Sequence, residues 1–114
     1  MARVDMSTVY VTQEVEGRNF IPAQKFGRLE ALLPSNAQIV FSAEPTLRKL
    51  ESSLAKFSDE DYLLMSGDPL IMGLALHVAL TNNRGYAKCL KWDKRERTYY
   101  EVVIDRYKKG EYVA

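Results

Sequence analysis

The most apolar part of the chain lies near its centre, where residues 62–65 (Tyr-Leu-Leu-Met) precede a bend and a long hydrophobic run. A strand of this composition has no polar face, which is typical of a strand covered on both sides. Gly67 permits a sharp bend, and Asp68 and Pro69 suit the cap and the first position of a helix. We therefore expect an interior strand over 62–65 and a helix from Asp68 or Pro69 to about Asn82.

Alternating and helical patterns predict the elements of the first half of the chain. Apolar and β-branched residues alternate over residues 7–15 and 37–41, which indicates two strands. Residues 20–25 are expected to form an ordered loop, and residues 26–33 fit either a short helix or a strand. Apolar residues at helical spacing over residues 45–57 predict an amphipathic helix with one buried face.

Two strand-like runs, residues 86–92 and 98–105, predict a β-hairpin with a loop of about five residues. We expect Leu90 to lie opposite Tyr100. Because side chains alternate between the two faces of a strand, this register puts Lys91 and Tyr99 on the outer face. The core face would then carry the following residues: Leu90, Trp92, Tyr100, Val102 and Ile104.

The order of these elements predicts a small single α/β domain over residues 1–114, with residues 106–114 as a mobile tail. Strands that alternate with helices imply parallel pairing with right-handed crossovers, and the final hairpin adds an antiparallel strand at one edge. We therefore expect a mixed, mostly parallel sheet, two main helices and a C-terminal β-hairpin.

Composition indicates an ordinary globular domain. Of 114 residues, 46% are hydrophobic and 27% are charged, with a net charge of +1. Residues 1–83 carry 7 Lys and Arg against 10 Asp and Glu, whereas residues 84–114 carry 9 against 5. No run approaches the roughly 18–20 apolar residues of a membrane span, and no signal peptide is apparent at the first residues. We expect a cytoplasmic protein in which the single Cys89 packs as a small hydrophobe.

The turn formed by Ser66, Gly67 and Asp68 follows the buried strand, where α/β sheets often bind ligands. Against a phosphate site, Asp68 puts a carboxylate where the phosphate would lie, and the chain has no glycine-rich phosphate-binding motif. We expect Asp68 to cap the helix. Residues 59–61 are expected to be a solvated acidic turn, because they lie about 17 Å from Asp68 at the other end of the strand and cannot share a metal ion with it.

No cofactor or metal site is expected, because His77 is the only histidine and lies among apolar residues. The best binding candidate is the hairpin, where cations are interleaved with aromatic residues, as in proteins that hold a nucleic-acid backbone and stack bases. Asp93 and Glu96 dilute this charge, so a protein interface is the competing interpretation. The candidate binding residues are Lys91, Lys94, Arg95, Arg97 and Tyr99.

Parts of the chain resemble a family of small proteins of tailed bacteriophages, including marine ones. The residues that carry the resemblance are Tyr10-Val11-Thr12-Gln13-Glu14, Gly17-Arg18-Asn19 with Pro22-Ala23, Asp59 to Pro69, and Leu90-Lys91-Trp92-Asp93. The resemblance implies a phage protein made in a host cytoplasm, and by analogy an accessory factor. It implies no catalytic residues.

Together these observations favour a non-enzymatic phage accessory protein that binds a macromolecule, in the first place a host or phage protein. One alternative is a nucleic-acid-binding protein that uses the hairpin over residues 86–105. A second is a small Rossmann-like enzyme with a ligand at residues 66–69. Strand 98–105 is expected at a sheet edge, where it could pair with a second copy to form a homodimer.

Overall fold

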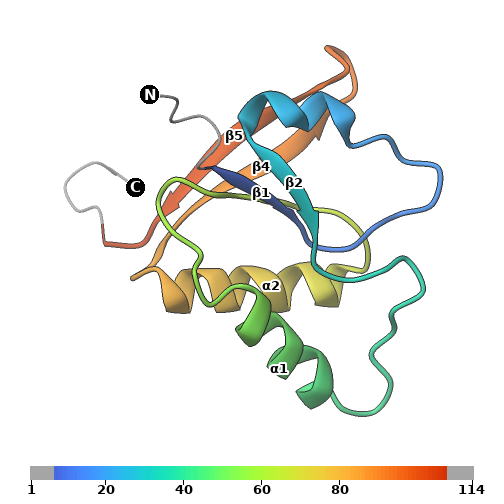
Figure 1. Ribbon diagram of the computed structural model, residues 1–114, viewed down its shortest axis with the longest axis vertical. Helices are drawn as coiled ribbons and strands as arrows, with labels where there is room; N and C mark the ends of the chain where they lie inside the picture. The colour runs from blue at the N-terminus through green and yellow to red at the C-terminus, as the bar shows by residue number, and fades with distance from the viewer. Residues whose placement is uncertain (1–6, 108–114) are drawn as a thin grey trace, which may run out of the picture.

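A five-stranded sheet forms the middle layer of the structure, a computed structural model that describes residues 7–107 (Figure 1). The strand order is β2-β1-β3-β4-β5. The first four strands are parallel and β5 is antiparallel to β4, which confirms the predicted α/β class and hairpin. Residues 108–114 of the predicted tail lie outside the described residues. The strands are β1 (Thr8–Val11), β2 (Arg28–Ala31), β3 (Tyr62–Leu64), β4 (Tyr86–Asp93) and β5 (Thr98–Asp105).

Helices cover both faces of this sheet. The helices α1 (Glu44–Ser53) and α2 (Pro69–Asn82) lie together on one face, and the short 3₁₀ helix η2 (Ile21–Phe26) lies on the other (Figure 1). Each face has its own core, because successive residues of a strand point to opposite sides. The α-helical face buries Tyr10, Leu63 and Ala87 with residues such as Leu50, Ile71 and Val78. The η2 face buries Val9, Val11, Leu64, Leu90 and Tyr99 with Ala23.

The strand β3 is the interior strand that the apolar run predicts. It pairs in parallel with β1 on one side and with β4 on the other. Leu63 is 0% exposed in the α-helical core and Leu64 is 1% exposed in the η2 core. A strand with no polar face is therefore stable here because apolar layers cover both of its faces.

The start of α2 also follows the prediction. The carboxylate of Asp68 accepts a hydrogen bond from the backbone N–H of Leu70 at 2.7 Å, and Pro69 occupies the first turn. At the other end, the buried Asn83 side chain donates to the Tyr86 carbonyl and to Asp59. Both ends of this apolar helix are thus closed by side-chain hydrogen bonds.

Several boundaries in the first half of the chain differ from the prediction. A loop was predicted over residues 20–25, but Ile21–Phe26 form the 3₁₀ helix η2, and the ambiguous segment 26–33 contains the strand β2. Gly27 links the two: a Cβ atom there would lie 2.7 Å from the carbonyl oxygen of Ser7. The backbone can therefore approach the start of β1 closely enough for the Arg28 N–H to bond to Ser7 O at 3.1 Å.

The predicted strand over residues 37–41 is wrong. Its alternation is present, since Ala37 and Ile39 pack against the core, but Val40 and Phe41 are 56% and 106% exposed. Among the described residues the sheet ends at β2 on this side, and the segment pairs with no strand of it. The predicted strand 7–15 is likewise only four residues long, and the predicted helix 45–57 ends at Ser53, although Leu54 and Phe57 are buried in the turns that follow.

The acidic turn over residues 59–61 is only partly solvated, contrary to the prediction. Asp61 is 6% exposed. Its carboxylate accepts hydrogen bonds from the backbone N–H of Thr8 at 3.0 Å and of Ser58 at 2.9 Å. A buried carboxylate needs such donors, and these bonds join the start of β3 to the start of β1.

The predicted hairpin register is wrong by one residue. Leu90 lies opposite Glu101 and not Tyr100, because β4 continues to Asp93 and the loop has four residues in place of five. A shift of one residue exchanges the two faces of a strand. On β5, Tyr99 is therefore buried in the η2 core, whereas Tyr100 and Val102, which we expected in the core, are 42% and 38% exposed. Trp92 keeps the face of Leu90, but near the end of β4 it is 42% exposed and not in the core.

The buried position of Leu64 predicts a large effect of its truncation. Leu64→Ala should lower the free energy of unfolding by about 2–5 kcal/mol, the usual range for a buried leucine. The matched control is Leu70→Ala, since Leu70 is 52% exposed on α2. Urea denaturation measures both variants, and a loss below about 1 kcal/mol for Leu64→Ala would show that β3 is not core.

Candidate functional site

The carboxyl ends of the parallel strands are the natural place for a binding site in this fold. From β1 the chain passes to β2 on one side, and it then returns to β3 on the other side of β1. Ligands of open α/β sheets bind where the strand order reverses in this way. The loops that follow β1 and β3 therefore form the candidate region.

Directly after β1 and β3, Thr12 and Ser66 join the two loops. The N–H of Thr12 donates to the Leu64 carbonyl at 3.1 Å. The Ser66 N–H donates to the Thr12 hydroxyl at 2.9 Å, and that hydroxyl donates to the Ser66 carbonyl. Both residues are buried, so these bonds continue the pairing of β1 and β3 beyond the strands themselves.

Gln13, also buried, connects three loops with its side-chain amide. Its Oε1 accepts from the backbone N–H of Asp68 at 2.8 Å, and its Nε2 donates to the carbonyls of Pro34 at 3.2 Å and Ala37 at 3.1 Å. Gly67 makes this approach possible, because it has φ +98° and a Cβ atom there would collide with the Gln13 side chain. The turn 66–68 thus has structural partners from the protein itself.

A pocket opens beside this junction, between the loop after β1 and the β4–β5 hairpin. We call it the hairpin pocket. Its volume is about 560 Å³. Arg18 lies between the two regions, since its Nη1 donates to the Ser66 hydroxyl at 3.4 Å. The lining residues are Gly17, Arg18, Asn19 and Pro22 from the loop, and Trp92, Lys94, Arg97 and Tyr99 from the hairpin.

Three cations and two aromatic rings define the chemistry of the hairpin pocket. Within residues 7–107, Arg18, Lys94 and Arg97 form no ion pair. The nearby Asp93 carboxylate instead accepts the backbone N–H groups of Arg95 and Glu96 and closes the hairpin loop. The pocket is therefore electropositive, which favours an anionic ligand.

The two rings of the pocket pack edge to face. The ring centroids of Trp92 and Tyr99 are 4.9 Å apart with 63° between the planes. Burial raises the pKa of the Tyr99 hydroxyl above its usual value, and the charge of Arg18 opposes this shift in part. The phenol therefore stays protonated at neutral pH, while the exposed part of Trp92 faces solvent.

Of the predicted binding residues, the structure brings Lys94, Arg97 and Tyr99 into the pocket, whereas Lys91 and Arg95 do not line it. Lys91 lies opposite Tyr100 on the other face of the hairpin. Sequence reasoning missed Arg18, because no local pattern places the loop after β1 next to the hairpin. It also assigned Trp92 to the core. Trp92 does share the face of Leu90 and packs on Tyr99, but near the end of β4 it is 42% exposed.

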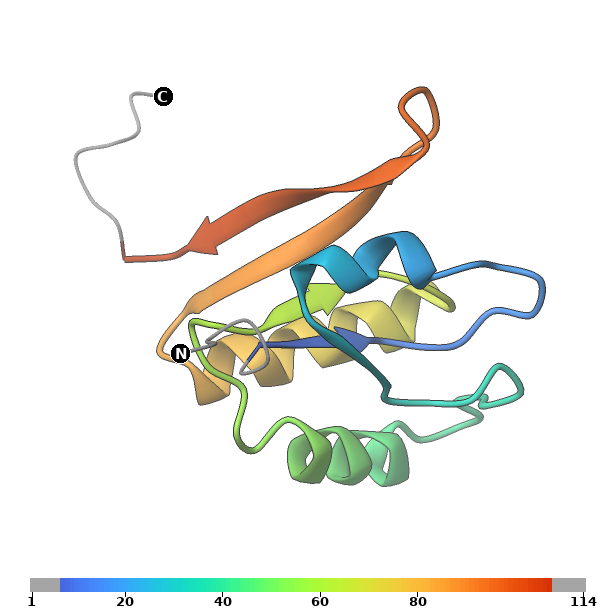
Figure 2. The same ribbon diagram turned by 45° about the horizontal axis from the view of Figure 1, so that its top comes forward.

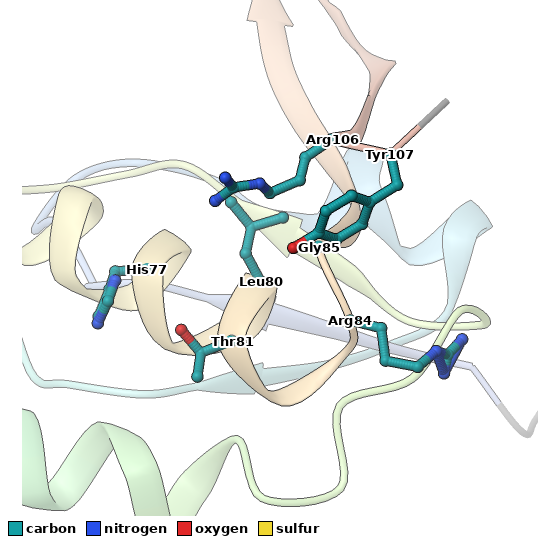
Figure 3. Close-up of a pocket in the computed structure, with 7 residues that line it drawn as sticks. All are labelled: His77, Leu80, Thr81, Arg84, Gly85, Arg106 and Tyr107. Atoms are coloured by element: carbon teal, nitrogen blue, oxygen red, sulfur yellow. The ribbon is translucent and has the colours of Figure 1, made fainter. Parts of the chain in front are cut away.

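A second, smaller hollow of about 360 Å³ lies at the opposite end of the hairpin, where α2 ends (Figure 3). In Figure 3, Arg106 extends over Leu80 and the Tyr107 ring lies near Gly85, while Arg84 points away from both. Arg84 instead lies 3.8 Å from Asp59. This hollow contains one exposed histidine, His77, and no carboxylate among its lining residues.

The fold and the pocket define a small α/β protein with a cationic, aromatic site beside the carboxyl ends of its parallel strands. The chain belongs to the Phage Pam3 gp32-like protein family, which it matches over residues 7–106. This confirms the resemblance to phage proteins. No curated protein and no solved structure matches the chain.

Residues 7–107 contain no group of three or more His, Cys, Asp or Glu side chains that could hold a metal ion. No helix within this part of the chain is long and apolar enough to cross a membrane. Cys89 is buried as predicted, and burial raises the pKa of its thiol, which disfavours the reactive thiolate.

The cap of α2 predicts a moderate effect of Asp68→Ala. Removing the carboxylate leaves the Leu70 N–H without its acceptor, so the free energy of unfolding should fall by about 0.5–2 kcal/mol. If Asp68 instead opposes an anion bound at the turn, the variant should bind inorganic phosphate more tightly than the native protein. Urea denaturation and calorimetric titration with phosphate separate the two roles.

Substitution of two glycines by alanine should change the stability of the protein in opposite directions. Gly67→Ala places a Cβ atom against Gln13 at a positive φ, so we expect a loss of at least about 1–2 kcal/mol of stability. Gly73→Ala is the matched control, because nothing lies within 4 Å of its Cβ position in α2. Alanine should stabilise that helix by about 0.5–1 kcal/mol. Equal thermal shifts for both variants would contradict the close contact at Gly67.

Proposed function

We propose that this phage protein is a non-enzymatic accessory protein that acts by binding another protein chain, and that β5 is its binding edge. The occupant we propose is β5 of a second copy, which would make the protein a two-fold homodimer. The observation that carries the proposal is the open edge of β5, eight residues long and largely exposed (Figure 2). As the resemblance implies, its place of action would be the host cytoplasm.

The hydrogen bonds of β4 indicate which groups of β5 are unpaired. The Leu90 carbonyl accepts from the Met65 N–H at 3.2 Å, so the backbone polar groups of Leu90 point toward β3. Leu90 lies opposite Glu101. Since hydrogen-bonded and non-hydrogen-bonded pairs alternate in an antiparallel ladder, the backbone groups of Glu101 and Val103 point to the open edge. An edge of this kind is a template for another strand.

The side chains of β5 support pairing with a partner. Tyr100, Val102 and Val103 are 42%, 38% and 47% exposed, and Tyr100 and Val102 lie opposite Lys91 and Cys89 on one face of the hairpin. Edge strands that avoid association are short, bulged or rich in charge. The centre of β5 instead carries a single charge, Glu101, among apolar residues.

The charge pattern of β5 favours a second copy in one register. If Val102 lies opposite Val102 of the second copy, Glu101 faces Val103, and Tyr100 faces Ile104. A shift by two residues keeps the side-chain faces but places Glu101 opposite either Glu101 or Asp105 of the second copy. Like charges directly opposite are destabilising, so both shifted registers are disfavoured. A closed two-fold pair also leaves no open edge at β5.

The enzyme alternative at residues 66–69 has less support. The backbone N–H groups of Asp68 and Leu70, which would hold an anion at the start of α2, donate to protein acceptors. An anionic substrate would have to displace Gln13 and Asp68 from these groups.

The dimer is tested by the molar mass in solution, measured by light scattering over a range of concentrations. The proposal predicts a rise from the monomer mass of 13.0 kDa to twice that mass as concentration increases. A mass that stays near 13.0 kDa throughout would refute pairing with a second copy.

Two lysine substitutions test the register. Val102→Lys puts two like charges opposite each other and should weaken the dimer by at least about tenfold. Val103→Lys, the matched control on the same strand, would face Glu101 of the second copy and should leave the dimer as stable or more stable. If the two variants weaken the dimer equally, the proposed register is wrong. Circular dichroism of both variants checks that the fold is kept.

A further inference from the structure

We propose that the hairpin pocket binds a nucleotide unit, meaning a planar base with a phosphate ester, either free or within a single strand of nucleic acid. This site is separate from the open edge of β5 and does not depend on the proposed dimer. The inference rests on the ring, the cations and the size of the pocket.

Trp92 provides the stacking surface. It is 42% exposed, although its ring packs on Tyr99 with a centroid distance of 4.9 Å. Tyr99 is itself 4% exposed and anchored in the η2 core, so the indole rests on a fixed support. Because this ring is already held in place, it loses little conformational freedom when a planar base stacks on it. Such stacking tolerates any base.

The cations provide the phosphate site. Arg18 comes from the loop after β1, and Lys94 and Arg97 come from the hairpin, so positive charge lines the pocket from two segments. None of them forms an ion pair within the described part of the chain. The fork of an arginine matches phosphate oxygens, and an unpaired cation near the surface gains from an anion without first losing a partner.

The size and the uncharged residues of the pocket agree with this ligand. A volume of about 560 Å³ lies within the usual range for small-molecule and cofactor sites. Gly17 and Pro22 add little bulk on the loop side beside Arg18, and Asn19 supplies an amide that can bond to the edge of a base. An acidic peptide would satisfy the cations but would leave the indole without a stacking partner.

The pocket contains its own reporter, because Trp92 is the only tryptophan of the chain. Titration of the native protein with a ten-residue oligothymidylate at low salt should quench the tryptophan fluorescence to saturation. With three phosphate contacts, the logarithm of the affinity should fall with the logarithm of the salt concentration at a slope of about −2. Adenosine monophosphate as a second probe distinguishes a free nucleotide from a strand.

The hairpin offers a matched pair of variants. Arg97→Asn removes a pocket cation, and asparagine tolerates the left-handed backbone that Arg97 adopts at φ +54°. Arg95→Asn removes an exposed cation of the same loop that does not line the pocket. We expect the first variant to weaken oligonucleotide binding about tenfold and the second to change it less than about twofold. Arg18→Ala should resemble Arg97→Asn, with unchanged melting temperatures as the check on folding.

The outcomes are distinct. The site is supported if either probe quenches the fluorescence to saturation, and if Arg97→Asn and Arg18→Ala weaken this binding while Arg95→Asn does not. No quenching by either probe, or equal loss in Arg95→Asn and Arg97→Asn, would overturn it. If a hexaglutamate peptide binds as tightly as the oligonucleotide, the assignment to a nucleotide is wrong and the ligand is a protein. Val102→Lys, which targets only the dimer, should keep the quenching.

Discussion

The hydrogen bonds between the loops that follow β1 and β3 are the constraint on which the rest of this structure depends. Two short parallel strands, four and three residues long, would hold each other weakly through their ladder alone. Thr12 and Gln13 extend the contact through buried side chains that bond to Ser66 and Asp68. A buried polar group costs free energy unless it forms hydrogen bonds. Here each hydrogen bond of the Thr12 and Gln13 side chains also holds a loop in place.

This junction positions both candidate surfaces. It sets the start of α2 through Asp68, and it holds the loop after β1 close enough for Arg18 to reach Ser66 and line the hairpin pocket. The hairpin comes from the other side, because β4 pairs with β3 and carries β5 outward to the edge of the sheet. The pocket and the open edge therefore lie at two sides of one hairpin, and the two proposed interactions do not compete for the same residues.

The sequence was sufficient for the fold class but not for the site, and particular residues show why. The strand over 62–65, the bend at Gly67 and the cap at Asp68 depend on local chemistry, so local patterns predicted them. The hairpin register depends on whether Asp93 belongs to the strand or to the loop, and this one residue decided which face Tyr99 occupies. Arg18 lines the pocket because the loop before η2 packs beside the hairpin. This contact joins residues far apart in the sequence, so no local pattern predicts it.

Hydrogen exchange at single backbone amides can show whether β5 pairs with β5 of a second copy. Because the amides of Tyr100 and Val102 face β4, they should be protected at every protein concentration. The amides of Glu101 and Val103 face the open edge, so we expect their protection to rise with protein concentration and to disappear in Val102→Lys. If these two amides exchange as free amides at every concentration while those of Tyr100 and Val102 are protected, no strand pairs with this edge and the proposed dimer is wrong.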